Sequence, residues 1–580
     1  MSTEEETKLS PVEGFKIESN YLRGDIAQEL VDSNDFFGKS SIQLLKNHGL
    51  YQQDDRDARA EKKVAGAKSS KAFSFMIRTK IPGGKLTSAQ MLAEMDLCDE
   101  VGNTTLRITS RQGLQLHGII KSDIQRVIRR IDEIQLSTLA ACGDVQRNFM
   151  CCPAPHNGDP VHAELQALAD QLAQHFCPRT KAYHEIWLRD PDNGEESLVG
   201  GGEPDYEPIY GPTYLPRKFK TAIGLAGDNC VDLYANDLGL MAICENFKVV
   251  GYNVLVGGGM GVTPSAKKTF PAVAKRMAFC TPEQVLDVAT AIVMVQRDFG
   301  NRADRKIARL KYLINDRGLD WYKAKVEEYA GFKLPDPHPQ DVFGFDDHLG
   351  WHEQGDGKLY YGLNVENGRI ADVDGWRLKA ALREICSRLK PNLRLTAHQS
   401  ILFCDLDPAA KDDLEGILRS HGVKLSHEIS NARRWSMACV AWPTCGLAIT
   451  ESERALPGLI DQLEAEVAKL GLSSEVFTVR MTGCPNGCAR PYNSDIGIVG
   501  KTAGKYTLFV GGRLWGDRLN FIYKDLVPEA EVVHTLVPLF VYFKQAREGS
   551  ETFGEFCARK GADDLLSWTA SFEADRDAGK

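Results

Sequence analysis

The segment Leu106-Arg-Ile-Thr-Ser-Arg-Gln-Gly-Leu-Gln-Leu-His117 occurs in this chain a second time, as Leu393-Arg-Leu-Thr-Ala-His-Gln-Ser-Ile-Leu-Phe403. Five positions match at a constant spacing of 287 residues, and the same spacing relates Arg147, Met150 and Cys152 to Arg434, Met437 and Cys439. A register held over about 45 residues indicates an internal duplication. Two unrelated segments of similar strand composition, the alternative, would explain one match but not a sustained series.

Each copy begins with the same predicted order of elements. Residues 73–78 are strand-like, a Pro-Gly-Gly turn follows at 82–84, and residues 88–101 have a helical pattern. In the second copy, a strand-like run at 359–365 leads to an Asn-Gly turn and to a helical pattern near 376–388. A weaker likeness between Asp237-Leu-Gly-Leu240 and Asp495-Ile-Gly-Ile498 continues the duplication at a different spacing. We expect each copy to hold a β-helix-β unit and a larger α/β unit, with a ligand site where the copies meet.

Composition and charge exclude several classes of protein. A chain of 580 residues with 43% hydrophobic residues has room for roughly three or four domains. Its net charge of −9 argues against a nucleic-acid binder, whose affinity normally comes from a basic surface. No apolar run reaches the roughly 18 residues needed to span a bilayer. The polar, acidic N-terminus lacks the pattern of a signal or transit peptide, so we expect a cytoplasmic protein.

Four of the 15 cysteines lie in two short loops, Cys439-Val-Ala-Trp-Pro-Thr-Cys445 and Cys484-Pro-Asn-Gly-Cys488. Four thiolates suit one soft metal centre, and iron–sulfur clusters are typically held by four cysteines. Zinc is the alternative, but structural zinc sites favour cysteine pairs with two to four intervening residues, and a longer spacer fits a larger object. The proline and glycines of the second loop let the backbone approach a cofactor closely, which disfavours four unrelated buried thiols.

Basic residues in strands and loops form a second candidate set. Lys218 and Lys220 are two apart around Phe219, a spacing that directs both side chains to the same side of a strand. Taken singly, each of the others is also compatible with a solvated strand residue. These others are Arg78, Arg107, Arg111, Arg147 and Arg217.

The cysteine loops carry a specific resemblance. Residues 439–457 (CVAWPTCGLAITESERALP) and 482–491 (TGCPNGCARP) resemble the cluster signature of the siroheme-dependent sulfite and nitrite reductases. The resemblance runs over essentially the whole chain, including SNYLRG at 19–24, YQQDDR at 51–56, YLPRKFK at 214–220 and LVGGG at 255–259. Within that family the assimilatory, NADPH-dependent sulfite-reducing branch is the most similar.

This resemblance implies an α+β fold, a pseudo-twofold duplicated sulfite/nitrite reductase fold with ferredoxin-like halves and two larger mixed α/β siroheme-binding domains. The expected division is an N-terminal arm and possible partner-docking segment at 1–60, the first ferredoxin-like half at 61–155 and the first siroheme-binding domain at 156–345. The second ferredoxin-like half follows at 346–430, and the second siroheme and cluster domain at 431–580.

The resemblance also implies the cofactors and the roles of the candidate residues. It implies siroheme and a 4Fe-4S cluster held by Cys439, Cys445, Cys484 and Cys488, with Cys488 also bridging to the siroheme iron. Siroheme carries many carboxylates and sulfite is an anion, so both need cations. The family pattern assigns substrate binding to Arg78, Arg147, Lys218 and Lys220. It assigns the siroheme carboxylates to Arg107, Arg111, Gln115 and Arg217.

The expected activity is the six-electron reduction of sulfite to sulfide in sulfate assimilation and cysteine biosynthesis. Gly257-Gly-Gly-Met-Gly261 lacks dinucleotide-loop spacing, so we expect the electrons to come from a partner, an NADPH-oxidising flavoprotein with FAD and FMN, in a hetero-oligomer. A ferredoxin-dependent nitrite reductase is the first rival; two lysines at 218 and 220 favour sulfite, because plant-type nitrite enzymes resemble this pattern with a neutral second residue. A cluster-bearing electron-transfer protein without siroheme is the second rival.

Overall fold

Each copy of the repeated segment folds into two strands joined by a tight turn. The computed structural model describes residues 8–64, 71–182, 186–200, 206–263 and 265–577. In it, β4 (Leu106–Ile108) pairs with β5 (Leu114–Ile119), and β18 (Asn392–Leu395) pairs with β19 (Ile401–Leu406). The turns contain Gln112 and Gln399, which share a left-handed backbone with φ of 52° and 63°. The repeated stretch is therefore a hairpin rather than one alternating strand.

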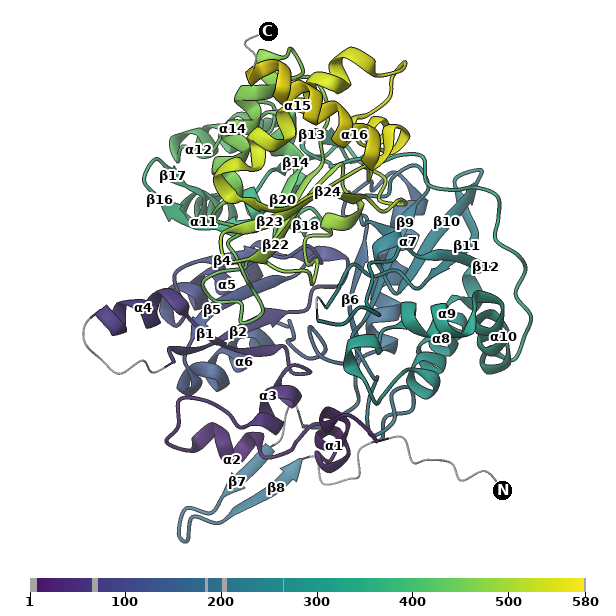
Figure 1. The fold of residues 1–580 in the computed structure, drawn as a ribbon. Helices are drawn as coiled ribbons and strands as arrows, with labels where there is room; N and C mark the ends of the chain where they lie inside the picture. Colours follow the sequence, from purple (N-terminus) through teal and green to yellow (C-terminus); the bar gives the residue numbers. More distant parts are fainter. Residues whose placement is uncertain (1–7, 65–70, 183–185, 201–205, 264, 578–580) are drawn as a thin grey trace.

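Two five-stranded sheets are built around these hairpins, and each borrows a strand from the other copy (Figure 1). The first has the order β1-β2-β5-β4-β15, with β1 (Leu50–Asp54), β2 (Phe73–Thr79) and β15 (Arg369–Ile370). The second has the order β13-β14-β19-β18-β3, with β13 (Gly350–Glu353), β14 (Leu359–Leu363) and β3 (Lys85–Leu86). The reciprocal exchange of β15 and β3 joins the two ferredoxin-like sheets, and their buried side chains form one core.

The helices of these two units cover the sheets as the sequence predicts. Helix α5 (Ser88–Glu100) begins with a capping box, in which Thr87 and Gln90 each bond the other's backbone N–H. Its counterpart α11 (Leu378–Arg388) starts two residues later than expected, because Trp376–Arg377 form β17 against β16 (Asp372–Val373). Helices α6 (Ile124–Glu133) and α12 (Lys411–Ser420) complete the two units.

Two larger sheets repeat one another strand for strand. The first runs β6 (Gln146–Cys151), β9 (Phe219–Leu225), β10 (Leu238–Glu245), β11 (Lys248–Val256) and β12 (Lys275–Cys280). The second runs β20 (Ser436–Ala438), β21 (Val479–Thr482), β22 (Ile496–Thr502), β23 (Lys505–Val510) and β24 (Phe521–Pro528). In both sheets, the first three strands are parallel to one another. The fourth and fifth strands each run antiparallel to the strand before them in the sheet. The α+β class and the pseudo-twofold duplication are thus confirmed.

Helices pack on each larger sheet and bury its apolar side chains in separate cores. Around the first sheet lie α7 (Pro160–His175), α8 (Val285–Phe299), α9 (Leu310–Arg317) and α10 (Leu319–Ala330). Around the second lie α13 (Asn431–Arg434), α14 (Leu456–Lys469), α15 (Val532–Ala546) and α16 (Phe553–Asp577). No helix among the described residues is long and apolar enough to cross a membrane.

The N-terminal arm packs on the body of the protein from Ser10 onward. It contains α1 (Pro11–Glu18), α2 (Ile26–Val31), α3 (Lys39–Leu45) and β1, and α4 (Arg56–Val64) follows. Glu13 pairs with Arg302, and the Lys16 ammonium donates to the Leu215 carbonyl at 2.9 Å. β1 pairs with β2 as the edge strand of the first sheet, so the arm is part of the folded unit. A role in docking stays a prediction.

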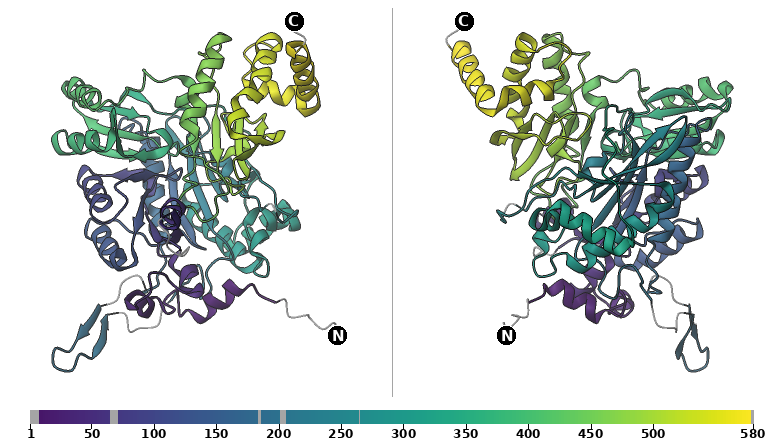
Figure 2. Two further views of the ribbon diagram at one scale, coloured as in Figure 1. Left: turned by 60° about the vertical axis from the view of Figure 1, so that its left-hand side comes forward. Right: turned by 90° about the vertical axis from the view of Figure 1, so that its right-hand side faces the viewer.

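One hairpin, β7 (Ile186–Arg189) and β8 (Glu196–Gly200), projects away from the rest of the molecule in all three views (Figures 1 and 2). In the same pictures the C-terminal helix lies at the opposite end of the molecule.

Candidate active site

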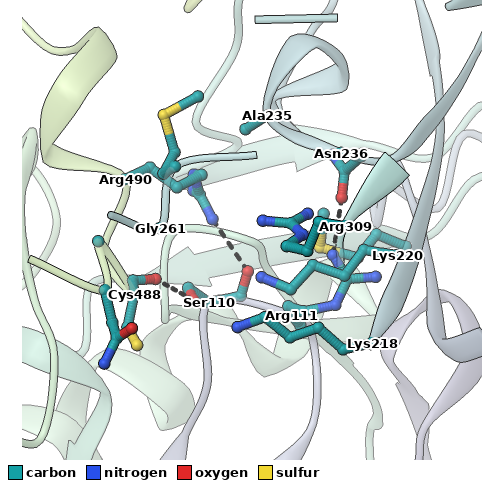
Figure 3. Close-up of a pocket in the computed structure, with 14 residues that line it drawn as sticks. Ser110, Arg111, Lys218, Lys220, Ala235, Asn236, Gly261, Arg309, Cys488 and Arg490 are labelled. Atoms are coloured by element: carbon teal, nitrogen blue, oxygen red, sulfur yellow. Dashed lines mark hydrogen bonds between the residues drawn. The ribbon is translucent and has the colours of Figure 1, made fainter. Parts of the chain in front are cut away.

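A cavity with about 430 Å³ of empty space lies where the two copies meet (Figure 3). The first copy contributes the β4–β5 turn, the start of β9 and the loop at 260–261, and the second contributes the cysteine loop at 486–490. The principal polar residues of its wall are Ser110, Arg111, Lys218, Lys220, Asn236, Arg309, Asn486, Cys488 and Arg490. The cavity therefore brings a row of cations from one copy against a cysteine of the other.

Lys218 and Lys220 supply the ammonium groups of the cavity. Phe219 between them is buried in the core of the first larger sheet, and this alternation directs the flanking lysines to the opposite side. Figure 3 shows both side chains extending into the cavity. Neither Nζ has a hydrogen-bond or ion-pair partner within the described part of the chain.

The cavity concentrates positive charge that the protein leaves without a counterion. Burial, followed by repulsion from Arg147, Arg217 and Arg309, lowers the pKa of Lys218 to about 7. Burial and then the Lys218 charge hold the pKa of Lys220 well below its usual value. Buried groups normally pair their charges, so unpaired cations around a cavity indicate a site for an anion.

Arg111 and Arg309 are fixed in place by bonds to neighbouring residues of the first copy. Arg111 donates to the Asn236 side-chain oxygen at 2.7 Å and to the Asn148 carbonyl at 2.6 Å. Its Nε is buried without a hydrogen-bond partner among the described residues. Arg309 forms a two-pronged pair with Asp237, at 3.2 and 2.6 Å. Arg111 thus keeps bonding capacity for a ligand, whereas Arg309 is already neutralised.

Arg78 and Arg147 are not among the residues that line the cavity. Arg78 donates to Cys142 Sγ at 2.9 Å, and with the Gln115 amide turned to face it, Gln115 Oε1 accepts from Arg78 at 3.1 and 2.5 Å. Arg147 donates to the Gly143 carbonyl and interacts with the buried Tyr51 hydroxyl. Since its charge acts on both lysines, Arg147 belongs to the same electrostatic unit.

Arg107 is paired with a carboxylate, whereas Arg217 is not paired with one in the described part of the chain. Arg107 Nε lies 3.0 Å from Glu453, and its Nη2 donates to the Ala438 carbonyl next to Cys439. Its charge acts on Cys439 and Cys488, so Arg107 faces the cysteine loops. Arg217 has no hydrogen bond or ion pair within the described residues, although Asp144 acts on it electrostatically.

The four predicted cysteines form one electrostatic group. Burial, and next the neighbouring Cys488, raise the pKa values of Cys439, Cys445 and Cys484, in the last case to about 12. Such thiols stay protonated unless a cation binds their sulfurs. Of the four, all described, Cys488 alone lines the cavity, and it is also the most exposed.

The four sulfurs are not gathered closely enough to surround a single ion. Among the described residues, the one group of ligand atoms close enough to surround a single ion is formed by other residues, Cys152, Asp228, Cys230 and His348. The cysteine loops approach each other through Gly483, whose N–H points to Cys439 Sγ at 3.4 Å. A Cβ at Gly483 would lie 2.5 Å from that of Ala441. Glycine at this position therefore lets the two cysteine loops approach each other closely.

Sequence reasoning missed Arg309, Arg490, Asn236 and Ser110. Arg490 follows Cys488 by two residues inside the quoted motif, a signal that could have nominated it. Its Nη1 donates to the Ser110 carbonyl at 3.0 Å, while the Ser110 hydroxyl donates to the Cys488 carbonyl at 3.2 Å. These two bonds connect the cysteine loop to the β4–β5 turn across the joint (Figure 3). No local pattern distinguishes Arg309.

Asp232 holds Arg490 and Arg480 together in the interior. Its carboxylate, fully buried, pairs with both guanidinium groups, with Arg480 at 2.9 Å. Burial alone would raise the pKa of Asp232, but the two arginines outweigh it and lower the pKa to about 2. Because this value lies below that of the unfolded chain, the pair contributes stability above about pH 4. The contribution is lost as the pH falls through about 2.

We expect Asp232→Asn to lower the free energy of unfolding by about 3–5 kcal/mol at neutral pH, because it leaves two buried guanidinium groups without a counterion. Urea denaturation measures the difference. Asp170→Asn is the matched control, since Asp170 pairs with Lys85 at the surface and a surface pair contributes at most about 1 kcal/mol. Equal losses in the two variants would contradict the assigned role.

Comparisons with known proteins agree with this geometry. A nitrite and sulphite reductase 4Fe-4S domain model matches residues 168–334, and the ferredoxin-like half-domain model of the same enzymes matches 68–134 and 352–421. The sulfite reductase (NADPH) hemoprotein beta-component of Staphylococcus saprophyticus is 43% identical over 555 residues, 96% of each chain. The ferredoxin sulfite reductase of Synechococcus elongatus is 43% identical over 98% of this chain and 92% of its own.

The solved structure of the Mycobacterium tuberculosis NirA protein superposes with a TM-score of 0.76 at 25% identity, covering 95% of each chain. The family models together cover more than half of the chain, and the relatives cover nearly all of it. The chain therefore belongs to the nitrite and sulphite reductase family.

Proposed function

We propose that this protein reduces sulfite to sulfide with six electrons, in assimilatory sulfur metabolism. The observation that carries the proposal is the cavity in which unpaired Lys218 and Lys220 face Cys488 from across the joint between the copies. An anion binds there because the protein supplies cations without counterions. The relatives named sulfite reductase, 43% identical over nearly the whole chain, support sulfite as that anion.

The residues present fit siroheme and a 4Fe-4S cluster. Cys439, Cys445, Cys484 and Cys488 would hold the cluster, and Cys488, the member that lines the cavity, would also hold the siroheme iron. Arg107, Arg111, Gln115 and Arg217 would bind siroheme carboxylates; the unpartnered Nε of Arg111 and the free guanidinium of Arg217 support this assignment. When bound, the two groups supply single electrons to the substrate sulfur.

The chain's own residues bind the substrate and supply protons. Arg78, Arg147, Lys218 and Lys220 would hold the sulfite oxygens, the arginines as fixed charges and the lysines as compact donors. Reducing sulfite to sulfide releases its three oxygens as water, so protons must reach each departing oxygen. A lysine whose pKa is near 7 can release a proton at neutral pH, and Lys218 is suited to that role.

We propose that the electrons come from a separate protein, an NADPH-oxidising flavoprotein that forms a hetero-oligomer with this chain. The name of the Staphylococcus relative, a beta-component, supports a partner subunit. The Synechococcus relative keeps ferredoxin as the alternative donor.

We also propose that the domains divide at residues 60, 155, 345 and 430. The four five-stranded sheets support this division.

Purified protein tests the proposal without the partner, because reduced methyl viologen can supply electrons directly. We expect visible absorption bands of a tetrapyrrole and stoichiometric formation of sulfide from sulfite. A spectrum with only the broad absorption of a cluster, together with no sulfide, would remove the proposed activity. Turnover of nitrite alone would assign the chain to the other branch of the family.

A further inference from the structure

A second group of metal-ligand side chains lies outside the cavity, in the first copy. Cys152 directly follows β6, Asp228 and Cys230 lie in the turn after β9, and His348 precedes β13. One ligand atom from each residue lies within 4.8 Å of all the others. Cys152, Cys230 and His348 are buried and Asp228 is partly buried. None of the four lines the cavity described above.

One ring nitrogen of His348 faces both the Cys152 sulfur and the Asp228 carboxylate. His348 Nε2 lies 3.5 Å from Cys152 Sγ and 3.1 Å from Asp228 Oδ2, and Sγ lies 3.0 Å from Oδ2. A catalytic triad would use the two ring nitrogens for its two partners, whereas here one nitrogen faces both. Tetrahedral zinc with ordinary bond lengths separates such ligand atoms by about 3.3–3.8 Å. The His348–Cys152 distance lies in this range, and Asp228 Oδ2 would move outward by a few tenths of an ångström to bind the ion.

The surroundings orient the four ligands. Backbone N–H groups of Cys230 and Asp346 donate to Asp228 Oδ1 at 3.2 and 3.1 Å, which leaves Oδ2 directed at the group. His348 Nδ1 is buried without a hydrogen-bond partner among the described residues, and Asp346 lies 3.9 Å from it. Metal-bound histidines commonly direct the other ring nitrogen at such a carboxylate.

A fifth residue, His162, lies beside the Cys152 sulfur. Its Nδ1 bonds Asp159 at 2.6 Å, and its side chain also hydrogen-bonds Cys152. With Nδ1 bonded to the carboxylate, the protonated ring of His162 can donate its other N–H to the sulfur. This is the arrangement of a supporting donor rather than of a ligand.

Two members of this group occupy positions in the first copy that correspond to cluster cysteines of the second copy. Cys152 corresponds to Cys439, since each lies five residues after the paired arginines Arg147 and Arg434. Cys230 corresponds to Cys488, since each lies seven residues before the paired aspartates Asp237 and Asp495. The sheets agree with this match, because β6 and β9 occupy the places of β20 and β21.

The first copy has kept only two of the four cluster thiols. At the spacing that relates Arg147 to Arg434, Gly158 corresponds to Cys445. At the spacing that relates Asp237 to Asp495, Ala226 corresponds to Cys484. Two thiols cannot hold a four-iron cluster by themselves. Asp228 and His348 complete instead a smaller set of one nitrogen, one oxygen and two sulfurs, which suits a single ion.

We propose that Cys152, Asp228, Cys230 and His348 bind one Zn²⁺ ion as a structural site, at the place in the first copy that corresponds to the iron–sulfur cluster of the second. The ion ties the ends of β6 and β9 to the connection that leads into the second copy. Asp347, the neighbour of His348, pairs with Arg434 of the second copy at 2.6 Å, so this connection is fixed on both sides. This inference does not depend on the proposed reaction.

Metal analysis of the holoenzyme, purified anaerobically, tests the site separately from the iron cofactors. We expect about one equivalent of zinc per chain, and a zinc-edge X-ray absorption spectrum with two sulfur ligands at about 2.3 Å and two nitrogen or oxygen ligands at about 2.0–2.2 Å. No stoichiometric zinc, or zinc with four or no sulfur ligands, would overturn the proposal. A disulfide between Cys152 and Cys230, detected by intact mass after thiol alkylation, would overturn it as well.

A double variant, Cys152→Ser with Cys230→Ser, should lose the zinc while keeping its iron and its visible spectrum. Cys404→Ser is the matched control, because Cys404 is buried in the same core without belonging to the group, and it should keep the zinc. Retention of zinc by the double variant would overturn the assignment. Where that variant does not fold, the ligand set seen at the zinc edge of the unmodified protein decides.

Discussion

Cys488→Ala is expected to reduce the rate of sulfite reduction by at least about 100-fold, because Cys488 serves the cluster and also faces the substrate cavity. No neighbouring thiol can replace it, since the other three cysteines do not line the cavity. Sulfide formation driven by reduced methyl viologen measures the loss, and iron content shows whether the cluster is retained.

The control for this variant is Cys177→Ala, at an exposed cysteine remote from both loops in sequence. Its rate should equal that of the unmodified protein. A Cys488→Ala protein that keeps its rate to within about threefold would contradict the central role of this sulfur.

Lys218→Arg is expected to lower kcat by about 100- to 10,000-fold while changing KM little, the range typical for loss of a general acid. Arginine keeps the positive charge that binds the anion but does not release its proton at neutral pH. Lysine at this position has a pKa of about 7, so it can do both. Lys218→Met should raise KM as well, because it also removes the charge.

The pH profile gives this prediction a second readout. A general acid must be protonated, so kcat/KM of the unmodified protein should fall as the pH rises through the pKa of Lys218. In Lys218→Met the alkaline limit of the residual activity should move to higher pH, because repulsion from Lys218 no longer lowers the pKa of Lys220. An unchanged profile in the variant would assign the proton transfer to another group.

The candidate residues of this site that the sequence nominated stand in short local patterns. The four cysteines, the glycine between their loops and the alternation at 218–220 are short-range patterns, and each corresponds to a local structure that one segment forms by itself. The duplication was likewise readable, because Gln112 and Gln399 recur with the same left-handed turn. Gln112 donates its amide to the Cys151 carbonyl at the end of β6, and Gln399 donates to the Ala438 carbonyl at the end of β20.

Contacts between distant segments could not be read in this way. Arg309 is held by Asp237 from a distant segment of the same copy, whereas Arg490 is held by Asp232 of the other copy, and both pairs depend on the tertiary fold. The exchange of β3 and β15 between the ferredoxin-like sheets is equally invisible, since each is a two-residue strand without a pattern of its own. Arg78 and Arg147 were nominated from the resemblance, and their positions outside the cavity lining depend on partners such as Cys142 and Tyr51.

The most direct test of the account is a crystal structure of the holoenzyme with the iron positions located by anomalous scattering. The account predicts four irons bound by Cys439, Cys445, Cys484 and Cys488, and a fifth beyond the Cys488 sulfur, on the side where Lys218 and Lys220 enter the cavity. A single ion between the four sulfurs, or an isolated iron away from these lysines, would contradict it.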